Sequence, residues 1–329
     1  MLGKHKSQNG TRAGLTLLVS VVVLSLLLTV CGGAKPKTYT IGMATEISQT
    51  AILDSFKARM TELGYVEGKN VTYIYHGVVG TDPQKNEAEI KSLMGQKADL
   101  LLTVGNAPSI AAKKAVEGTG TPVVFAPILD PVGAGLVASL SHPGGNLTGV
   151  QTLNTTPKVL EWLIKIAPGT KQVYAPYNPA DRTALEFIKP LPDTAAQLGV
   201  KLVLDEVSSG EEELATIKTL PKDSAILFVT SPSLDSSLVD AVNLAIELRI
   251  PTGARNLMAE KTLINYTTDR ALQGKQAAVL ADKVFKGTKP GDLPVETAEY
   301  LLTLNLKTAE AIGLNIPDEI LHQAKNVIR

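Results

Sequence analysis

Polar side chains follow nearly every predicted strand of this 329-residue chain, at the points where the strands end. When parallel strands alternate with helices, ligands bind beyond the carboxyl ends of the strands. We therefore take these positions as candidate ligand-binding residues. They are Glu46, Ser48, Asn106, Ala107, Ser109, Asp130, Thr152, Asn154, Tyr177, Asn178, Thr230, Ser231 and Arg255.

Three of these candidates favour an anionic group on the ligand. Ser109 and Ser231 stand near predicted helix starts, where free backbone N–H groups attract an anion such as a carboxylate. Arg255 could bind a carboxylate through two parallel hydrogen bonds. Each has an alternative, because serine is a common N-cap and Arg255 could instead form a surface salt bridge. Taken together, around one facing cleft, the candidates favour small-molecule binding.

The sequence contains no recognisable catalytic or cofactor motif. Its four histidines are scattered, and it has no nucleophile elbow, paired-histidine metal motif or phosphate-binding loop. Residues 133–138 fit the dinucleotide pattern G-x-G-x-x-A, but no acidic residue follows about 20 positions later to bind a ribose. Close packing of a short helix over 133–140 explains that pattern better. We expect no enzyme activity, no cofactor and no metal site.

The N-terminal segment has the pattern of an export signal. Lys4, Lys6 and Arg12 precede an apolar run at 15–30, which is shorter than the ~20 apolar residues that cross a bilayer. Cys31, the only cysteine of the chain, follows directly. The pattern predicts that the rest of the chain works outside the cytoplasm.

The lone cysteine predicts a lipid-modified N-terminus. Two acyl chains on Cys31 would give stable membrane attachment. We expect a signal peptide at 1–30 and a lipid-anchored linker at 31–37. The alternatives are an uncleaved anchor and ordinary secretion, since Val30 is bulkier than the residue that usually precedes such a cysteine.

Charge and cysteine content exclude several classes of protein. Without the three basic residues of the signal, 29 of the 32 basic residues remain against 32 acidic ones, a net charge of −3. Nucleic-acid binding normally needs a basic patch, so we expect no such partner. Beyond Cys31 no cysteine remains for a disulfide or a thiolate metal site. We expect a monomer.

Strands and helices alternate regularly through both halves of the remaining chain. Such alternation predicts parallel sheets with helices on both faces. The expected fold class is therefore α/β, with two doubly wound parallel-sheet lobes that meet near residue 150. The expected strands are 38–44, 71–75, 99–104, 122–126 and 148–151 in the first half, and 172–175, 201–207, 225–230, 251–253 and 263–266 in the second.

Several blocks of sequence resemble one family along nearly all of residues 38–329. The family is that of the substrate-binding lipoproteins of ABC transporters, in the tryptophan/tyrosine-type group. The motifs DPVGAGLV and PGGNLTGV are specific when they occur together. The blocks are LGYVEGKNV at 63–71, PVVF at 122–125, DPVGAGLV at 130–137, PGGNLTGV at 143–150, YNP at 177–179, NLKTA at 305–309 and GLNIP at 313–317.

The resemblance implies a type I periplasmic-binding-protein fold, in which two lobes joined by a hinge enclose a ligand. The first lobe would comprise 38–150 plus about 268–291, and the second 151–267 plus about 292–329. The implied ligand is a small polar molecule, an amino acid, with aromatic amino acids among those bound by relatives. The implied partners are an ABC permease and, through it, a separate ATPase.

The chain departs from the family pattern in places. The departures are the loop 46–50, Pro127, the stretch Ala180-Asp181-Arg182, and Arg255-Asn256. Ligand identity is therefore open. Two other functions also stay open: a sensory module that passes its closed form to a signalling partner, and a secreted α/β enzyme.

Overall fold

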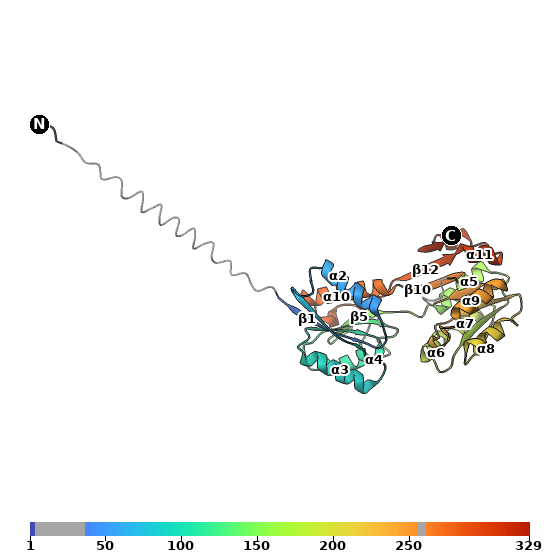
Figure 1. The fold of residues 1–329 in the computed structure, drawn as a ribbon, viewed down its shortest axis with the longest axis horizontal. Helices are drawn as coiled ribbons and strands as arrows, with labels where there is room; N and C mark the ends of the chain where they lie inside the picture. Colours follow the sequence, from blue (N-terminus) through green and yellow to red (C-terminus); the bar gives the residue numbers. More distant parts are fainter. Residues whose placement is uncertain (4–36, 256–260) are drawn as a thin grey trace.

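The computed structural model describes residues 1–3, 37–255 and 261–329. The expected signal peptide and Cys31 lie outside these residues. The described chain forms two α/β lobes connected by three crossing segments (Figure 1). Within the described residues, no helix has the length and apolar character needed to span a bilayer.

The first lobe is built around a six-stranded, all-parallel sheet in the order β11-β5-β4-β3-β1-β2. Its central strand β3 is buried along its whole length, as expected of an apolar strand covered on both faces. The strands are β1 (Tyr39–Thr45), β2 (Val71–Val78), β3 (Leu100–Val104), β4 (Val123–Ile128), β5 (Leu147–Gln151) and β11 (Glu296–Thr297).

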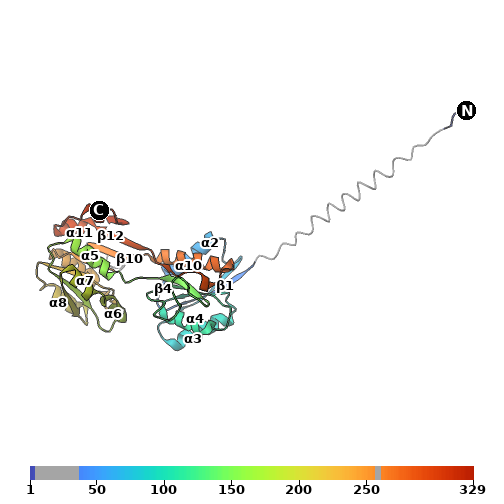
Figure 2. The same ribbon diagram turned by 180° about the vertical axis from the view of Figure 1, so that it is seen from behind.

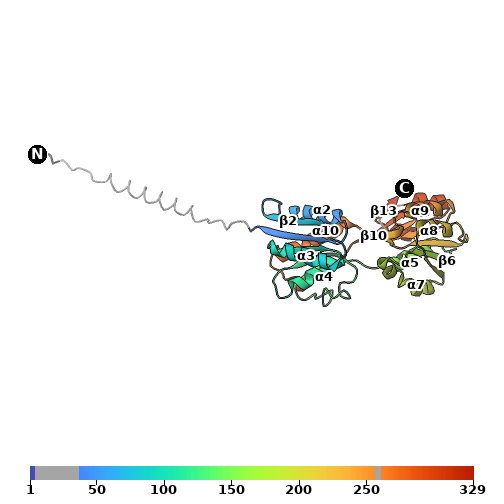
Figure 3. The same cartoon turned by 60° about the horizontal axis from the view of Figure 1, so that its bottom comes forward.

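Helices cover both faces of this first sheet, and a hydrophobic core lies under each layer. One core joins Phe56 and Ala277 to the sheet, and the other joins Ile90 and Ala112 to it. In Figure 3, α2 and α10 lie on one side of the sheet and α3 and α4 on the other. The helices are α2 (Thr50–Glu62), α3 (Pro83–Gly95), α4 (Asn106–Val116) and α10 (Arg270–Phe285).

Helix α10 returns to the first lobe and packs directly on α2. Gly274 of α10 permits the close approach, because a Cβ there would overlap the Ser55 hydroxyl and the Ile52 carbonyl oxygen of α2. Asp269 caps the helix by accepting hydrogen bonds from the N–H groups of Ala271 (2.7 Å) and Leu272 (3.3 Å). Asp is a preferred N-cap residue because its carboxylate satisfies N–H groups that lack a partner within the helix.

The second lobe contains a seven-stranded sheet in the order β13-β12-β10-β9-β8-β6-β7. All neighbours are parallel except β10 and β12, where Ile264 lies opposite Leu304 in antiparallel register. The strands are β6 (Gln172–Tyr177), β7 (Lys201–Glu206), β8 (Ser224–Phe228), β9 (Thr252–Ala254), β10 (Ile264–Thr268), β12 (Tyr300–Asn305) and β13 (Asn326–Ile328).

Helices also cover both faces of the second sheet. One core includes Leu160, Phe187 and Leu304, and the other includes Tyr174 and Phe228. The α-helices are α5 (Thr156–Ile166), α6 (Arg182–Ile188), α7 (Leu191–Leu198), α8 (Gly210–Ile217), α9 (Leu238–Glu247), α11 (Leu306–Ile312) and α12 (Asp318–Leu321), and the short 3₁₀ helices are η1 (Pro232–Leu234) and η2 (Pro290–Asp292).

Two local expectations need correction. Residues 133–140 form turns rather than a helix, because Gly135 adopts a left-handed conformation with φ of +68° and ends any helical path. The last crossing also comes after Thr297, not at about 292. Residues 296–297 add strand β11 to the first sheet beside β5, and Ala298 N–H donates to the Gln151 carbonyl (2.8 Å).

Candidate functional site

The carboxyl edges of the two sheets face each other. We call the carboxyl edge of the first lobe's sheet the first edge, and that of the second lobe's sheet the second edge. Strand β5 ends at Gln151, where the chain leaves the first lobe, and β10 ends at Thr268, where it returns. The other parallel strands of each sheet point the same way as these two. The loops that follow the strands therefore lie on the sides of the lobes that carry the crossings, which Figure 2 shows from behind.

Arg255 is the most unusual residue of the second edge. It follows β9, and its Cζ lies 3.8 Å from the centre of the Phe187 ring, a distance typical of a cation–π contact. Its Nη2 donates to the Leu153 carbonyl (3.2 Å), whereas its buried Nε has no hydrogen-bond partner. Burial lowers the pKa of Arg255, and Tyr300 partly opposes this effect.

No acidic side chain balances this charge among the residues that the structure describes, since none of their ion pairs includes Arg255. Arg255 is half-buried, and burying a charge is costly unless it is paired and hydrogen-bonded. The guanidinium can therefore gain free energy from an anionic group that approaches the edge. A carboxylate would match its planar donors.

Thr230 and Ser231 connect this arginine to an acidic residue. The Thr230 hydroxyl donates to the Arg255 carbonyl (3.1 Å). The Ser231 hydroxyl donates to Asp181 Oδ2 (2.6 Å) and accepts the N–H of Asn178 (3.1 Å). Ser231 is 2% exposed, so its hydroxyl serves this internal network rather than an N-cap: Ser231 makes no side-chain cap bond to η1.

Tyr177 and Asn154, both candidates from the sequence, hydrogen-bond to segments next to the second edge. The Tyr177 hydroxyl donates to Glu206 Oε1 (2.9 Å). The Asn154 amide donates to the carbonyls of Glu186 (3.0 Å) and Phe187 (3.2 Å), and its oxygen accepts the N–H of Thr156 (3.1 Å). Because these groups already have partners, they hold the loops around Arg255 in place.

The first edge presents fewer polar groups. Glu46 Oε2 accepts the N–H of Ala107 (3.1 Å) at the start of α4, which uses one of the free N–H groups of that helix. Ser48 and Asn106 are exposed, and Thr152 is half-buried. Large apolar side chains occupy the same edge: Ile47 after β1 is 54% exposed, and Val78 at the end of β2 is 53% exposed.

Two candidates on the first lobe have internal roles. Ser109 is fully buried, and its hydroxyl pairs with the Thr103 hydroxyl (2.8 Å) and the Gly105 carbonyl (2.7 Å). Asp130 Oδ1 accepts the N–H of Gly133 (2.8 Å) and closes a turn. The structure thus gives these two side chains partners inside the lobe, and their contact with a ligand stays a prediction.

Tyr300 and Leu153 join two of the crossing segments. The Tyr300 hydroxyl donates to the Leu153 carbonyl (2.9 Å) and accepts the Leu153 N–H. The Tyr300 ring lies 5.3 Å from the Tyr266 ring, which in turn meets Trp162 edge-on at 4.8 Å. Since Arg255 also donates to Leu153, the candidate site and the hinge share one backbone carbonyl.

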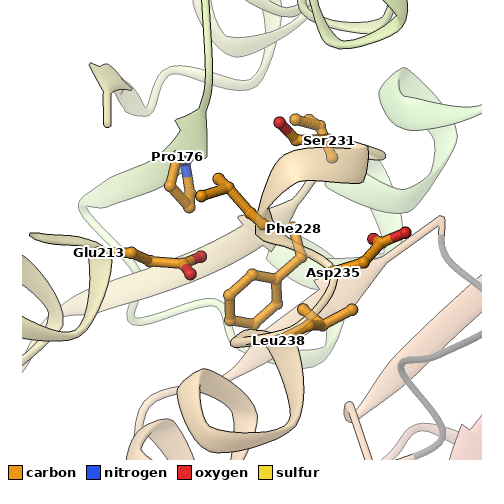
Figure 4. A pocket seen from close by; sticks show the side chains of 8 residues that line it. Pro176, Glu213, Phe228, Ser231, Asp235 and Leu238 are labelled. Carbon is orange, nitrogen blue, oxygen red and sulfur yellow. The ribbon is translucent and has the colours of Figure 1, made fainter. Parts of the chain in front are cut away.

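A small cavity lies behind Ser231 in the second lobe (Figure 4). Glu213 lines it together with Pro176 and Phe228. The Glu213 side chain is 2% exposed and accepts a hydrogen bond from the Ser237 hydroxyl (3.0 Å). Burial raises the pKa of Glu213 to about 7, although the bond from Ser237 lowers it in part.

Sequence reasoning missed Asp181, Phe187 and Tyr300 as members of this site. Asp181 lies four positions beyond the end of β6 at Tyr177, within a run that looks like an ordinary turn. Phe187 points toward Arg255 from a helix, and only the folded chain shows that contact. Tyr300 begins β12 directly after a crossing, so an accurate crossing position could have identified it.

Comparisons of the sequence with known proteins give matches that cover most of the chain. The family model for ABC transporter substrate binding proteins matches residues 43–328. A tyrosine-binding protein of Clostridioides difficile strain R20291 is 27% identical over 263 residues, which cover 79% of this chain and 75% of that protein.

Solved structures share the same fold. The ABC domain from Streptococcus pneumoniae, in complex with L-Trp, has a TM-score of 0.70 at 22% identity and covers 89% of this chain and 100% of that one. A ligand-free, open substrate-binding protein from Clostridium difficile has a TM-score of 0.74 at 22% identity, covering 89% and 99%. A solute-binding protein from Bacillus halodurans with bound myo-inositol has a TM-score of 0.58 at 13% identity, covering 85% and 99%. The fold is that of type I periplasmic binding proteins.

Proposed function

Because this chain belongs to the family of ABC transporter substrate-binding proteins, we propose that it captures an amino acid between its lobes and delivers it to a membrane permease. As a member of that family it is an extracytoplasmic binding protein and not an enzyme. In this proposal the two lobes, divided at the three crossings, are the domains that close on the ligand. A separate protein hydrolyses ATP to drive transport.

The observation that carries the proposed ligand class is the unpaired Arg255. Its guanidinium stacks on Phe187 and has no acidic partner among the described residues, and its Nε makes no hydrogen bond. An α-carboxylate would supply both the charge and the acceptor atoms. The tyrosine-binding protein and the complex with L-Trp among the similar proteins make aromatic amino acids the first ligands to test.

Closure of the hinge would complete the site. The second edge holds the carboxylate, and the first edge, with Glu46 and exposed Ile47, then covers the rest of the ligand. Such closure around a ligand is the usual motion of two-lobed binding proteins. In the closed form the two lobes would be held in one relative position. We propose that this form, as a monomer, docks on the permease.

A lipid on Cys31 would keep the protein beside its permease. The support for this step is the sequence pattern of the signal at 1–30 and the lone cysteine that follows it. Mass spectrometry of the protein from its host membrane tests it: a diacylated Cys31 at the new N-terminus is expected. An intact residue 30–31 bond, or an unmodified secreted chain, would contradict the anchor without affecting ligand binding.

Thermal melting with each of the twenty L-amino acids tests the ligand class. A ligand at about 100 times its Kd stabilises the folded state by about 2.7 kcal/mol, which shifts Tm by several degrees. We expect L-tyrosine or L-tryptophan among the amino acids that raise Tm. If no amino acid changes Tm, the ligand is not an amino acid, and other small carboxylates become the candidates.

A further inference from the structure

Asp181 lies on the same edge as Arg255 and carries the opposite charge. It follows β6, at the start of α6. Its Oδ2 accepts three hydrogen bonds, from the Ser231 hydroxyl (2.6 Å), the Ser233 hydroxyl (2.8 Å) and the Ser233 N–H (3.1 Å). Its Oδ1 accepts none from the described part of the chain.

These bonds keep the Asp181 carboxylate ionised. Burial alone would raise the pKa of Asp181, but the bonds from Ser231 and Ser233 outweigh burial and lower it. Hydrogen bonds to the charged form of a carboxylate have this effect. The residue is half-buried, so a ligand can reach its free oxygen.

Adjacent residues of one loop bond to both charged residues. The Thr230 hydroxyl donates to the Arg255 carbonyl (3.1 Å) and accepts from Arg255 Nη1 (3.5 Å), and the Ser231 hydroxyl donates to Asp181 (2.6 Å). Consecutive Cα atoms are about 3.8 Å apart, so both charged residues bond to neighbouring points of this loop. The ammonium and carboxylate groups of an α-amino acid stand on one carbon atom and present the complementary pair of charges.

We propose that Asp181 binds the ammonium group of the ligand while Arg255 binds its carboxylate, so that the second lobe alone selects zwitterionic α-amino acids. This assignment rests on the proposed function and names a residue for the group that Arg255 cannot bind. Ammonium and carboxylate form a charge-assisted hydrogen bond, about twice as strong as a neutral one.

The other carboxylates near the two edges fit this role less well. Glu206 accepts the Tyr177 hydroxyl (2.9 Å) behind the loops. Glu46 lies on the opposite lobe and bonds to the Ala107 N–H (3.1 Å). Of these three carboxylates, Asp181 is the one that bonds to the same loop as Arg255.

Calorimetric titration of the full chain with paired ligands tests the assignment. The probes are L-tyrosine and 3-(4-hydroxyphenyl)propionate, which lacks the ammonium group. L-Tryptophan and indole-3-propionate form the second pair, and any other amino acid that raises Tm is paired with its own des-amino acid. Asp181→Asn keeps an oxygen that can accept from Ser231 and Ser233 and removes only the charge. Asp193→Asn, on the exposed first turn of α7, is the matched control.

We expect wild type to bind the amino acid at least tenfold more tightly than its des-amino analogue. Asp181→Asn should weaken amino-acid binding by about ten- to hundredfold, the value of a hydrogen bond to a charged group, and leave the analogue within twofold. Asp193→Asn should change neither.

Three outcomes would overturn the assignment. If wild type and Asp181→Asn bind the amino acid with equal affinity, Asp181 does not bind the ammonium group, and the proposed function is unaffected. A loss confined to Glu46→Gln moves the ammonium site to the first lobe. If wild type binds none of the twenty L-amino acids, the Asp181 assignment and the amino-acid ligand both fail.

Discussion

The two facing edges of this protein are chemically different. The second edge joins Arg255, Thr230, Ser231 and Asp181 by hydrogen bonds before any ligand arrives. On the first edge, Glu46 accepts the N–H of Ala107, and the side chains of Ser109 and Asp130 bond within the lobe. Preformed donors and acceptors lower the free-energy cost of ordering a site on binding. The polar groups of a ligand should therefore engage the second edge first.

The first edge offers apolar surface instead. Ile47 and Val78 are more than half exposed at the ends of β1 and β2. Exposed apolar side chains next to a proposed ligand site can bury surface when the lobes close, and burial contributes about 25 cal/mol per Å². Because the edges differ in this way, separate mutations should affect recognition of the ligand's charged groups and closure of the two lobes.

Removal of the Arg255 charge should have the largest effect. We expect Arg255→Gln to weaken L-tyrosine binding more than hundredfold, about 3 kcal/mol, because a ligand carboxylate would lose its bidentate partner. The matched control is Arg182→Gln, an exposed arginine of the same edge, which should change affinity less than twofold. Calorimetry measures both. Equal losses in the two variants would mean that overall positive charge, not the Arg255 contact, attracts the ligand.

The two lobes also differ in their buried carboxyl groups. Asp282 of the first lobe bonds to Lys286 Nζ (2.8 Å) and to the Tyr65 hydroxyl (3.0 Å). Glu213 of the second lobe has a bond from the Ser237 hydroxyl (3.0 Å) and no ion pair among the described residues. Burial raises the pKa of Glu213 to about 7, so this carboxyl group should titrate near neutral pH while the protein stays folded.

Stability of the second lobe should therefore fall as pH rises. The pKa of Glu213 is raised from 4.5 to about 7 in the folded state, so the folded protein holds a proton that the unfolded chain has released between these values. The cost of ionising Glu213 is absent below about pH 4.5, grows as pH rises and is complete above about pH 7. It amounts to about 3 kcal/mol at 1.36 kcal/mol per pKa unit.

Glu213→Gln tests this sign. The variant should melt several degrees higher than wild type at pH 8 and within a degree or so of it at pH 4.5, since a neutral side chain pays no ionisation cost. Glu211→Gln, on the exposed first turn of the same helix, should leave the Tm difference between the two pH values unchanged. A stabilisation that is equal at both pH values would point to packing rather than to the buried charge.

The hinge connects the two edges. Tyr300→Phe changes this hinge, and we expect its effect on L-tyrosine affinity to be smaller than that of Arg255→Gln. The variant leaves both the N–H and the carbonyl of Leu153 without the Tyr300 hydroxyl. We expect a loss of about 1–2 kcal/mol in the free energy of unfolding by urea, and a several-fold loss of L-tyrosine affinity because Leu153 also positions Arg255.

Tyr266→Phe is the control for that experiment. Tyr266 keeps its ring contacts to Trp162 and Tyr300 in this variant, so both quantities should stay near wild type. Trp162 is the only tryptophan of the chain, and its ring contacts Tyr266, so its fluorescence should report changes around Tyr266. A wild-type urea midpoint in Tyr300→Phe would show that the hydroxyl does not stabilise the hinge.

The sequence predicts the sheets better than it predicts the site. Alternation of apolar strands with amphipathic helices depends on local periodicity, and β3, β4 and β8 lie close to their expected positions. Helix 133–140 fails because a left-handed Gly135 and the Asp130 turn decide that segment. Strand β11 has two residues, too few for any periodic signal.

Site residues are harder because their roles depend on distant partners. Ser109 and Ser231 look alike in sequence, yet one bonds within the first lobe and the other bonds to Asp181, 50 positions away. Arg255 stacks on Phe187 across 68 positions. Such contacts come from the packing of loops against helices, which residue type and spacing do not encode.

The apolar first edge should give the smallest effect. Ile47→Ser and Val78→Ser remove exposed side chains, so the free energy of unfolding should change by less than about 0.5 kcal/mol. If the lobes close on an aromatic ligand, each variant should weaken L-tyrosine binding by several-fold, because less apolar surface is buried. Leu248→Ser, 42% exposed beyond the end of α9, is the matched control and should leave affinity unchanged. Unaltered affinity in Ile47→Ser and Val78→Ser would mean that the first edge closes without touching the ligand, and would leave recognition to the second edge alone.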